Sequence, residues 1–71
     1  GVTTAPAVKE QRVYFGTDAG RFYSLEESQG RYVLAWSYKA KGMARLVGAP
    51  VIVDDRVVFI CANGKVYVFE E

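Results

Sequence analysis

The chain has 71 residues, a formal net charge of +1 and a hydrophobic content of 51%. This length allows at most one small domain, which buries only about 60% of the surface that its unfolded chain exposes. The nearly balanced charge gives no reason to expect nucleic acid as a partner, and no apolar run is long enough to insert into a membrane as a helix.

Histidine is absent, so the chain lacks the commonest general base and metal ligand. Cys61 is the only cysteine, so an intrachain disulfide cannot form. It ends an apolar strand pattern and has no evident cationic neighbour to lower its pKa, which favours a buried, inert thiol over a reactive one. We therefore expect no catalytic residue, no metal ligand and no bound cofactor.

The first part of the chain predicts four strands, at residues 7–9, 12–17, 21–26 and 31–39. Pro6 stands at the start of the first strand, where its missing N–H costs least. Polar or glycine-containing turns separate the strands. These turns are Glu10-Gln11, Asp18-Ala19-Gly20 and Ser28-Gln29-Gly30. Gly20 and Gly30 are therefore expected to be structural residues.

The same pattern recurs after a basic, glycine-containing connection at residues 40–48. Matching residues are 44 positions apart, as Val13 and Val57 are. Asn63 and Gly64 predict a type I′ hairpin turn, because both central residues of that turn need a positive φ. The strands predicted in this second copy are 51–53, 56–61 and 65–70.

The predicted strand 56–61 is apolar on both faces, with Val57 and Phe59 on one and Val58 and Ile60 on the other. A sheet with one face in water would alternate apolar and polar residues, so this sheet needs a cover on both sides. A strand-built repeat of this length is typical of β-propeller blades, which stack face to face.

The sequence therefore predicts an all-β fold made of antiparallel β-sheet blades of a β-propeller, in one segment over residues 1–71. Residues 5–48 form a four-stranded blade, and residues 49–71 supply three strands of the next. A closed propeller needs at least about four blades. We therefore expect the chain to be a fragment of a larger propeller or, failing that, to associate with copies of itself.

The first unit reads APAV at residues 5–8 and RVYFGTDAGRFYSL at residues 12–25, followed by Gly30 and Trp36. This pattern resembles the quinoprotein-type β-propeller repeat of pyrroloquinoline-quinone dehydrogenases, of the outer-membrane assembly lipoprotein of Gram-negative bacteria and of sensor-like extracytoplasmic domains. The resemblance covers nearly the whole chain and implies a periplasmic or extracytoplasmic location. It implies no activity, because most such repeats bind no quinone.

The blade-docking motif of that family reads Ala-x-Asp-x-x-x-Gly-x-x-x-Trp. Ser24 stands at the alanine position, Glu26 at the aspartate position and Gly30 at the glycine position. The tryptophan position falls on Leu34, and Trp36 comes two residues later. Because side chains alternate along a strand, both are expected on the same face, with Trp36 packed between blades.

The favoured function is non-enzymatic: a scaffold or protein-binding segment of a quinoprotein-like β-propeller. Its expected partners are other blades of the parent chain, copies of itself or another protein. Two alternatives stay open, a fragment of a quinone-dependent dehydrogenase and a segment of an extracytoplasmic sensor domain. The quinone dehydrogenases carry a pair of adjacent cysteines near the cofactor, and this chain has no such pair.

Two groups of side chains are candidates for binding. Tyr32, Trp36 and Tyr38 are expected on one face of strand 31–39. They could form an aromatic platform for a ligand. Packing is the favoured alternative, because aromatic residues at every second position of a strand usually pack against a neighbour. Acidic residues could form a calcium or catalytic carboxylate pair, but none lies in a matching motif, and turn chemistry explains Asp18, Asp54 and Asp55.

The basic connection is the third candidate. Residues 28–53 contain four basic residues, Arg31, Lys39, Lys41 and Arg45, and no acidic one. Lys39, Lys41 and Arg45 lie in or beside a loop, and loops carry function more often than the scaffold does. They are therefore predicted to contact an anion or an acidic protein, the alternative being a solvated loop.

Overall fold

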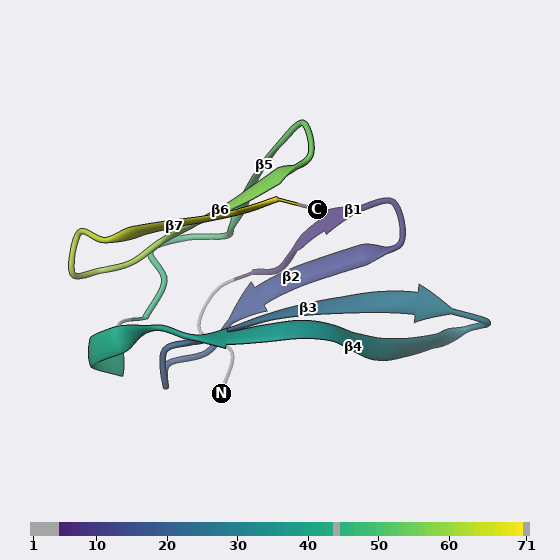
Figure 1. Cartoon of the computed structure of the whole chain (residues 1–71), viewed down its shortest axis with the longest axis horizontal. Helices are drawn as coiled ribbons and strands as arrows, with labels where there is room; N and C mark the ends of the chain where they lie inside the picture. The colour runs from purple at the N-terminus through teal and green to yellow at the C-terminus, as the bar shows by residue number, and fades with distance from the viewer. Residues whose placement is uncertain (1–4, 44, 71) are drawn as a thin grey trace.

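The computed structural model describes residues 5–43 and 45–70, which form two antiparallel sheets (Figure 1). The first sheet consists of β1 (Ala7–Lys9), β2 (Arg12–Gly16), β3 (Arg21–Ser28) and β4 (Arg31–Lys39), in that order. The second consists of β5 (Val51–Val53), β6 (Arg56–Ile60) and β7 (Val66–Glu70). A single 3₁₀ turn, η1 (Lys41–Met43), lies on the connection between the sheets.

The predicted all-β fold is confirmed, and so are its strands, whose ends differ from the prediction by two residues at most. The largest difference is in β3, which continues to Ser28. Gln29 and Gly30 follow with φ values of 54° and 78°, the two positive values that a type I′ turn requires. Because this turn matches the twist of the strands, β3 and β4 run directly into it.

The turn at Asn63 and Gly64 is not the predicted type I′ turn. Of the two residues only Gly64 has a positive φ, of 87°. The N–H of Gly64 donates to the carbonyl of Cys61 at 3.0 Å, and the N–H of Cys61 donates to the carbonyl of Lys65 at 2.9 Å. The loop is therefore a three-residue hairpin with glycine in the left-handed position. Asn63 contributes through its Oδ1, which accepts the N–H of Lys65 at 3.1 Å.

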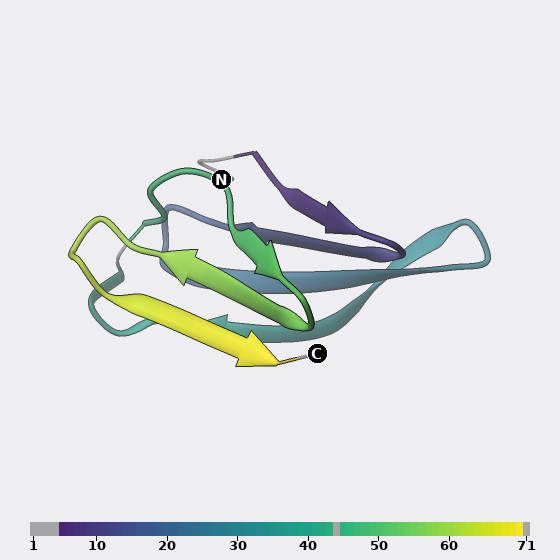
Figure 2. The same ribbon diagram turned by 90° about the horizontal axis from the view of Figure 1, so that it is seen from above.

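The two sheets pack face to face and share one core (Figure 2). At its centre the rings of Phe22 and Phe59 stack with centroids 4.5 Å apart and planes 3° from parallel. Tyr67 and Phe69 of β7 meet Phe22 edge-on. The fully or nearly fully buried apolar residues are Tyr14, Phe22, Ala40, Leu46, Val57, Phe59 and Cys61.

The strand register of the first sheet recurs in the second with the offset of 44 residues. Arg12 pairs with Glu26, as Arg56 pairs with Glu70. The remaining pairs follow the same rule along β1–β2–β3 and β5–β6–β7. The sequence repeat is therefore also a structural repeat, and the two copies stack on each other.

A β-bulge in β4 corrects the expected orientation of Trp36. Ser24 pairs with Trp36 but Leu25 pairs with Leu34, so Ala35 is an extra residue in β4. Consecutive residues of β3 face opposite ways, so Trp36 and Leu34 lie on opposite faces rather than on the same one. Trp36 packs in the core, with its ring centroid 4.8 Å from that of Phe69, whereas Leu34 is 59% exposed.

The bulge also divides the predicted aromatic platform. Tyr38 lies on the same face as Trp36, at the edge of the core, with its ring centroid 6.1 Å from that of Phe22 and 39% of its surface exposed. Tyr32 pairs with Glu27 beyond the bulge, on the outward face, and is 59% exposed. Trp36 and Tyr38 are therefore packing residues, and the three rings do not form one surface.

Gly16 is required because Leu46, on the connection between the two sheets, packs directly against it. A Cβ atom on Gly16 would lie 2.5 Å from Cδ1 and 2.8 Å from Cγ of Leu46. Leu46 is buried and is held in place by a bridge to Cys61. Only glycine leaves room for Leu46 at the end of β2.

We predict that Gly16→Ala lowers the free energy of unfolding by about 1–3 kcal/mol, the usual cost of overpacking. Leu46→Ala alone should cost about 2–5 kcal/mol, since it leaves a cavity. In the double variant the added methyl group occupies part of that cavity, so the loss should be smaller than the sum of the two. Chemical denaturation measures all three, and additive losses would contradict the contact.

Trp36→Ala is predicted to cost roughly 3–5 kcal/mol, the range for a packed tryptophan. Tyr32→Ala, on the same strand but facing outward, should stay within about 0.5 kcal/mol of the parent, as surface substitutions do. Urea unfolding midpoints with a common slope give both values. Equal losses for the two variants would show that the assignment of faces along β4 is wrong.

Candidate functional site

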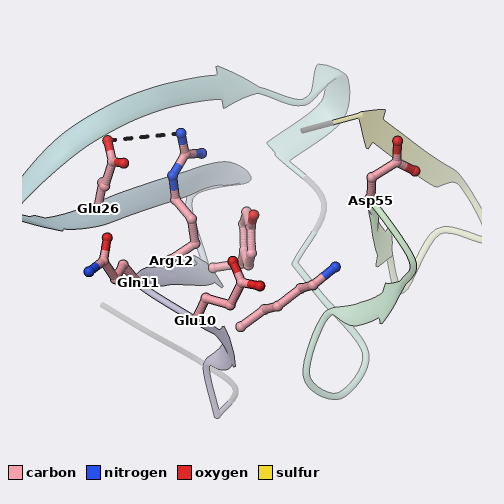
Figure 3. Close-up of a pocket in the computed structure, with 7 residues that line it drawn as sticks. Glu10, Gln11, Arg12, Glu26 and Asp55 are labelled. Atoms are coloured by element: carbon pink, nitrogen blue, oxygen red, sulfur yellow. Dashed lines mark ion pairs between the residues drawn. The ribbon is translucent and has the colours of Figure 1, made fainter.

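A cleft of about 350 Å³ opens where the β1–β2 turn meets the β5–β6 turn (Figure 3). Lys9 spans the two turns, because its Nζ donates a hydrogen bond to the backbone carbonyl of Asp54. Asp55 faces the cleft from the second sheet, and the remaining lining comes from the first. The lining residues are Lys9, Glu10, Gln11, Arg12, Tyr14, Glu26 and Asp55.

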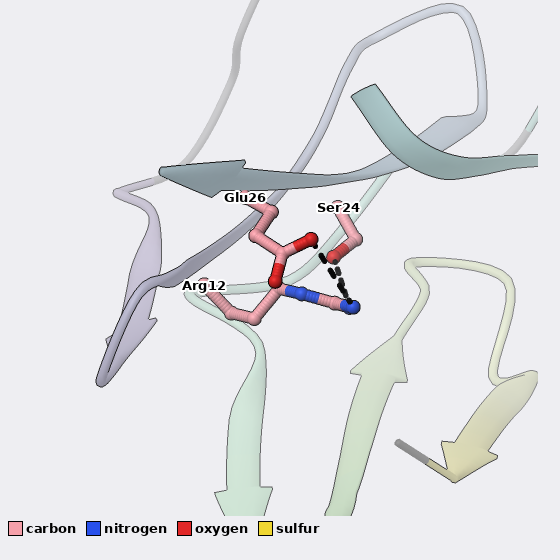
Figure 4. Close-up of polar contacts among 3 residues, drawn as sticks. All are labelled: Arg12, Ser24 and Glu26. Atoms are coloured by element: carbon pink, nitrogen blue, oxygen red, sulfur yellow. Dashed lines mark hydrogen bonds and ion pairs between the residues drawn. The ribbon is translucent and has the colours of Figure 1, made fainter. Parts of the chain in front are cut away.

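Arg12 is the central polar group of this cleft (Figure 4). Its Nη2 lies 4.0 Å from Oε1 of Glu26, and its Nη1 donates to Oγ of Ser24 at 3.2 Å. Ser24 is fully buried and cannot reach water, so this bond gives its hydroxyl a hydrogen-bond partner within the protein. The guanidinium therefore joins the polar rim of the cleft to the apolar core.

The cleft carries both signs of charge, with Lys9 and Arg12 against Glu10, Glu26 and Asp55. Arg12 and Glu26 compensate each other, so no strong field of one sign is left for a ligand. Over residues 5–43 and 45–70 no group of three histidine, cysteine or acidic residues could hold a metal ion.

The basic residues singled out in the sequence lie elsewhere. Lys39 ends β4, Lys41 begins the 3₁₀ turn and Arg45 follows it, all with exposed side chains. This turn lies at one end of the long axis and the β3–β4 hairpin at the other, with the β1–β2 and β5–β6 turns between them (Figure 1). The structure thus keeps the three residues on one exposed connection and does not bring them into the cleft.

The cleft itself was not foreseen from the sequence. Glu10, Glu26 and Asp55 were considered for a carboxylate pair, but turn chemistry was favoured for Asp55, and Glu26 was otherwise a motif position. The sequence did contain a sign of the Arg12–Glu26 ion pair, because the two residues recur 44 positions later as Arg56 and Glu70. In the structure Nε of Arg56 and Oε2 of Glu70 lie 3.8 Å apart. A repeated pair of opposite charges at cross-strand positions predicts a repeated ion pair.

The glycines expected to be structural have the backbone conformations that this role requires. Gly20 and Gly64 occupy equivalent turns, with φ values of 81° and 87°. Gly30 completes the type I′ turn described above. A side chain at any of the three would be strained by the positive φ alone.

Cys61 is buried, with 2% of its surface exposed, as the sequence predicted. Burial raises the pKa of its thiol, because the apolar surroundings disfavour the charged thiolate. The thiol form is the stable one in the folded chain. The contribution of the buried thiol to the free energy of unfolding is present below the ordinary thiol pKa of about 8.5. It is lost as the pH rises through the higher pKa that the thiol has in the folded chain.

We predict that Cys61 reacts with iodoacetamide much more slowly than a free thiol at the same mildly alkaline pH. Both burial and the raised pKa reduce the amount of accessible thiolate. The rate should rise to that of a free thiol when urea unfolds the chain. Mass spectrometry of the alkylated protein follows the reaction, and rapid labelling under native conditions would show that the site is open.

No family model matches the chain, and no curated protein or solved structure shows significant similarity to it. Within the described part of the chain, no helix has the length and apolar character needed to cross a membrane.

Proposed function

We propose that the chain is a non-enzymatic scaffold or protein-binding segment of a quinoprotein-like β-propeller. In this proposal the four-stranded sheet is one blade and the three-stranded sheet supplies three strands of the next. Its location would be periplasmic or extracytoplasmic, as the family resemblance implies. The observation that carries the proposal is that both sheets are apolar on the faces that point away from their shared core.

The outward face of the three-stranded sheet is the clearer case. Val53, Val66 and Val68 are each more than half exposed, at 53%, 55% and 54%. Val51 and Ile60 lie on the same face and are exposed at 47% and 42%. A contiguous aliphatic surface of this kind marks an interaction site rather than a solvated face.

The four-stranded sheet has an outward apolar face as well. Phe15 and Tyr23 stack there with centroids 5.2 Å apart, next to the cross-strand pair Val13 and Leu25. Fully burying a side chain of this size contributes about 1.5–3 kcal/mol. Each sheet is thus suited to be covered on both sides, as a blade inside a stack is.

The basic connection would be a second, weaker contact of this scaffold. Lys39, Lys41 and Arg45 are exposed on a segment without acidic residues, which suits an acidic protein surface. Such rim charges act mainly on the rate of association and on its salt dependence.

The proposal predicts that pyrroloquinoline quinone with Ca²⁺ does not bind the chain. Titration followed by the quinone absorbance should give no saturable change, and the pair should support no alcohol-dependent reduction of a dye. Saturable binding of one quinone per chain would favour the dehydrogenase alternative instead.

Exposure of the aliphatic face can be tested with the dye ANS, which binds exposed apolar surface. In dilute solution the parent chain should enhance ANS fluorescence, and the Val66→Thr/Val68→Thr variant should lose most of that enhancement. Threonine keeps the branched shape and the β-propensity, so the fold should be retained. An unchanged signal would show that this face is not available to a partner.

A further inference from the structure

The structural repeat assigns a specific partner to the two outward faces. Each sheet has a face that carries its Arg–Glu ion pair and an opposite face that does not; we call these the ion-pair face and the plain face. In the first sheet the ion-pair face holds Arg12, Tyr14, Phe22, Ser24 and Glu26, and in the second it holds Arg56, Val58, Val66, Val68 and Glu70. The plain faces hold Val13, Phe15, Tyr23 and Leu25, and Val57, Phe59, Tyr67 and Phe69.

The internal interface joins unlike faces. The ion-pair face of the first sheet is buried against the plain face of the second, with Phe22 stacked on Phe59. This contact leaves the plain face of the first sheet and the ion-pair face of the second pointing outward. The two free faces are therefore the repeat equivalents of the two faces that already bind each other.

We infer that a second copy of this chain docks head to tail on the first, repeating the internal interface. The inference rests on the proposed function, since it names the partner of the same apolar faces. Under the 44-residue offset, Phe22 corresponds to Val66, and Phe59 to Phe15. Val66 of one copy would thus pack against Phe15 of the next, with Tyr23 beside it as Tyr67 lies beside Phe22.

The chemistry of the two free faces suits this contact. The free ion-pair face is aliphatic apart from Arg56 and Glu70, which already neutralise each other at 3.8 Å at one end of the strands. The centre of the free plain face offers the aromatic and aliphatic side chains of the pairs Phe15–Tyr23 and Val13–Leu25. Charged residues lie toward its ends, with Arg21 and Lys39 at one end and Glu27 at the other. The central pairs of the two faces can therefore meet without burying a charge.

Two differences separate the free face from its internal counterpart. Within the described residues the second sheet has no strand equivalent to β4, so the contacts of Trp36 and Tyr38 with β7 are not repeated. Ile60 occupies the position that Gly16 has in the first sheet, so the space that Gly16 leaves for the side chain of Leu46 is not repeated. The contact between copies therefore depends on the cross-strand neighbours Val58, Val66 and Val68 of β6 and β7.

Head-to-tail contacts join unlike surfaces and do not stop at a dimer; they give rings if the rotation closes and open chains if it does not. Each copy contributes two units, so rings of about three or four copies correspond to six to eight blades, within the range of propellers. Assembly should therefore proceed past the dimer as the concentration rises.

Sedimentation velocity over a dilution series is the first test. The parent chain should form species larger than a dimer, and Val66→Lys should raise the concentration needed by more than about tenfold, since it places an unpaired charge in the contact. Ser28→Lys adds the same charge at the distant β3–β4 hairpin and should leave association unchanged. A parent chain that stays monomeric throughout would overturn the inference.

Cross-linking distinguishes this contact from other modes of association. In a Cys61→Ala background, Val66→Cys and Phe15→Cys are made as separate chains and treated with a short bismaleimide. Cross-links should form in the mixture of the two and not in either chain alone. Efficient cross-linking of Val66→Cys with itself would instead indicate a two-fold contact or pairing of β7 edges, and would overturn the head-to-tail arrangement.

The two proposals fail in different ways. A monomeric chain that still binds ANS through Val66 and Val68 would refute docking of a second copy and leave the scaffold function standing. Saturable quinone binding with turnover would refute the scaffold function whatever the state of association.

Discussion

The packing of Phe22 against Phe59 is the contact on which the rest of this structure depends. Each sheet is small, and a two- or three-stranded sheet without a covered face is marginally stable at best. The stacked pair joins the centres of both sheets. Tyr67, Phe69 and Trp36 meet it edge-on, and Tyr38 stacks beside Phe22. Such pairs add about 0.5–1.5 kcal/mol beyond the area that they bury.

This interface also fixes the positions of the polar groups. Ser24 is buried beside the aromatic cluster, and Arg12 satisfies it from the edge of the sheet while pairing with Glu26. The cleft at the two turns is the place where the sheets diverge and leave those groups in contact with solvent. Its mixed charges lie at the rim of the interface between the two repeats.

Much of the fold could be predicted from the sequence because local signals agree with the repeat. Apolar strand patterns and polar turns predicted every strand of the described residues, and the strand register recurs with the same offset of 44 residues. The Asn63–Gly64 turn was predicted wrongly, because the dipeptide fits several hairpin loops and the sequence does not show how many residues the loop contains. The extra residue at Ala35 leaves no local signature either, so the faces of Leu34 and Trp36 could not be assigned.

The cleft and the Gly16–Leu46 contact depend on how distant segments meet, which strand periodicity does not encode. The outward faces were predictable in composition, since apolar residues occupy both sides of β6. Their equivalence to the faces of the internal interface emerges only when register and burial are compared between the two sheets. That equivalence links the fold to the proposed role as a unit that other units of the same kind cover.

The central claim is that the two repeats form one cooperative unit through a single interface. Native-state hydrogen exchange of Phe59→Leu tests it most directly. The account predicts that amides of β2 and β3 lose as much protection as those of β6 and β7, because neither sheet stays folded without the other. Loss of protection confined to β6 and β7, with β2 and β3 unchanged, would show that the first sheet is stable by itself and would contradict the account.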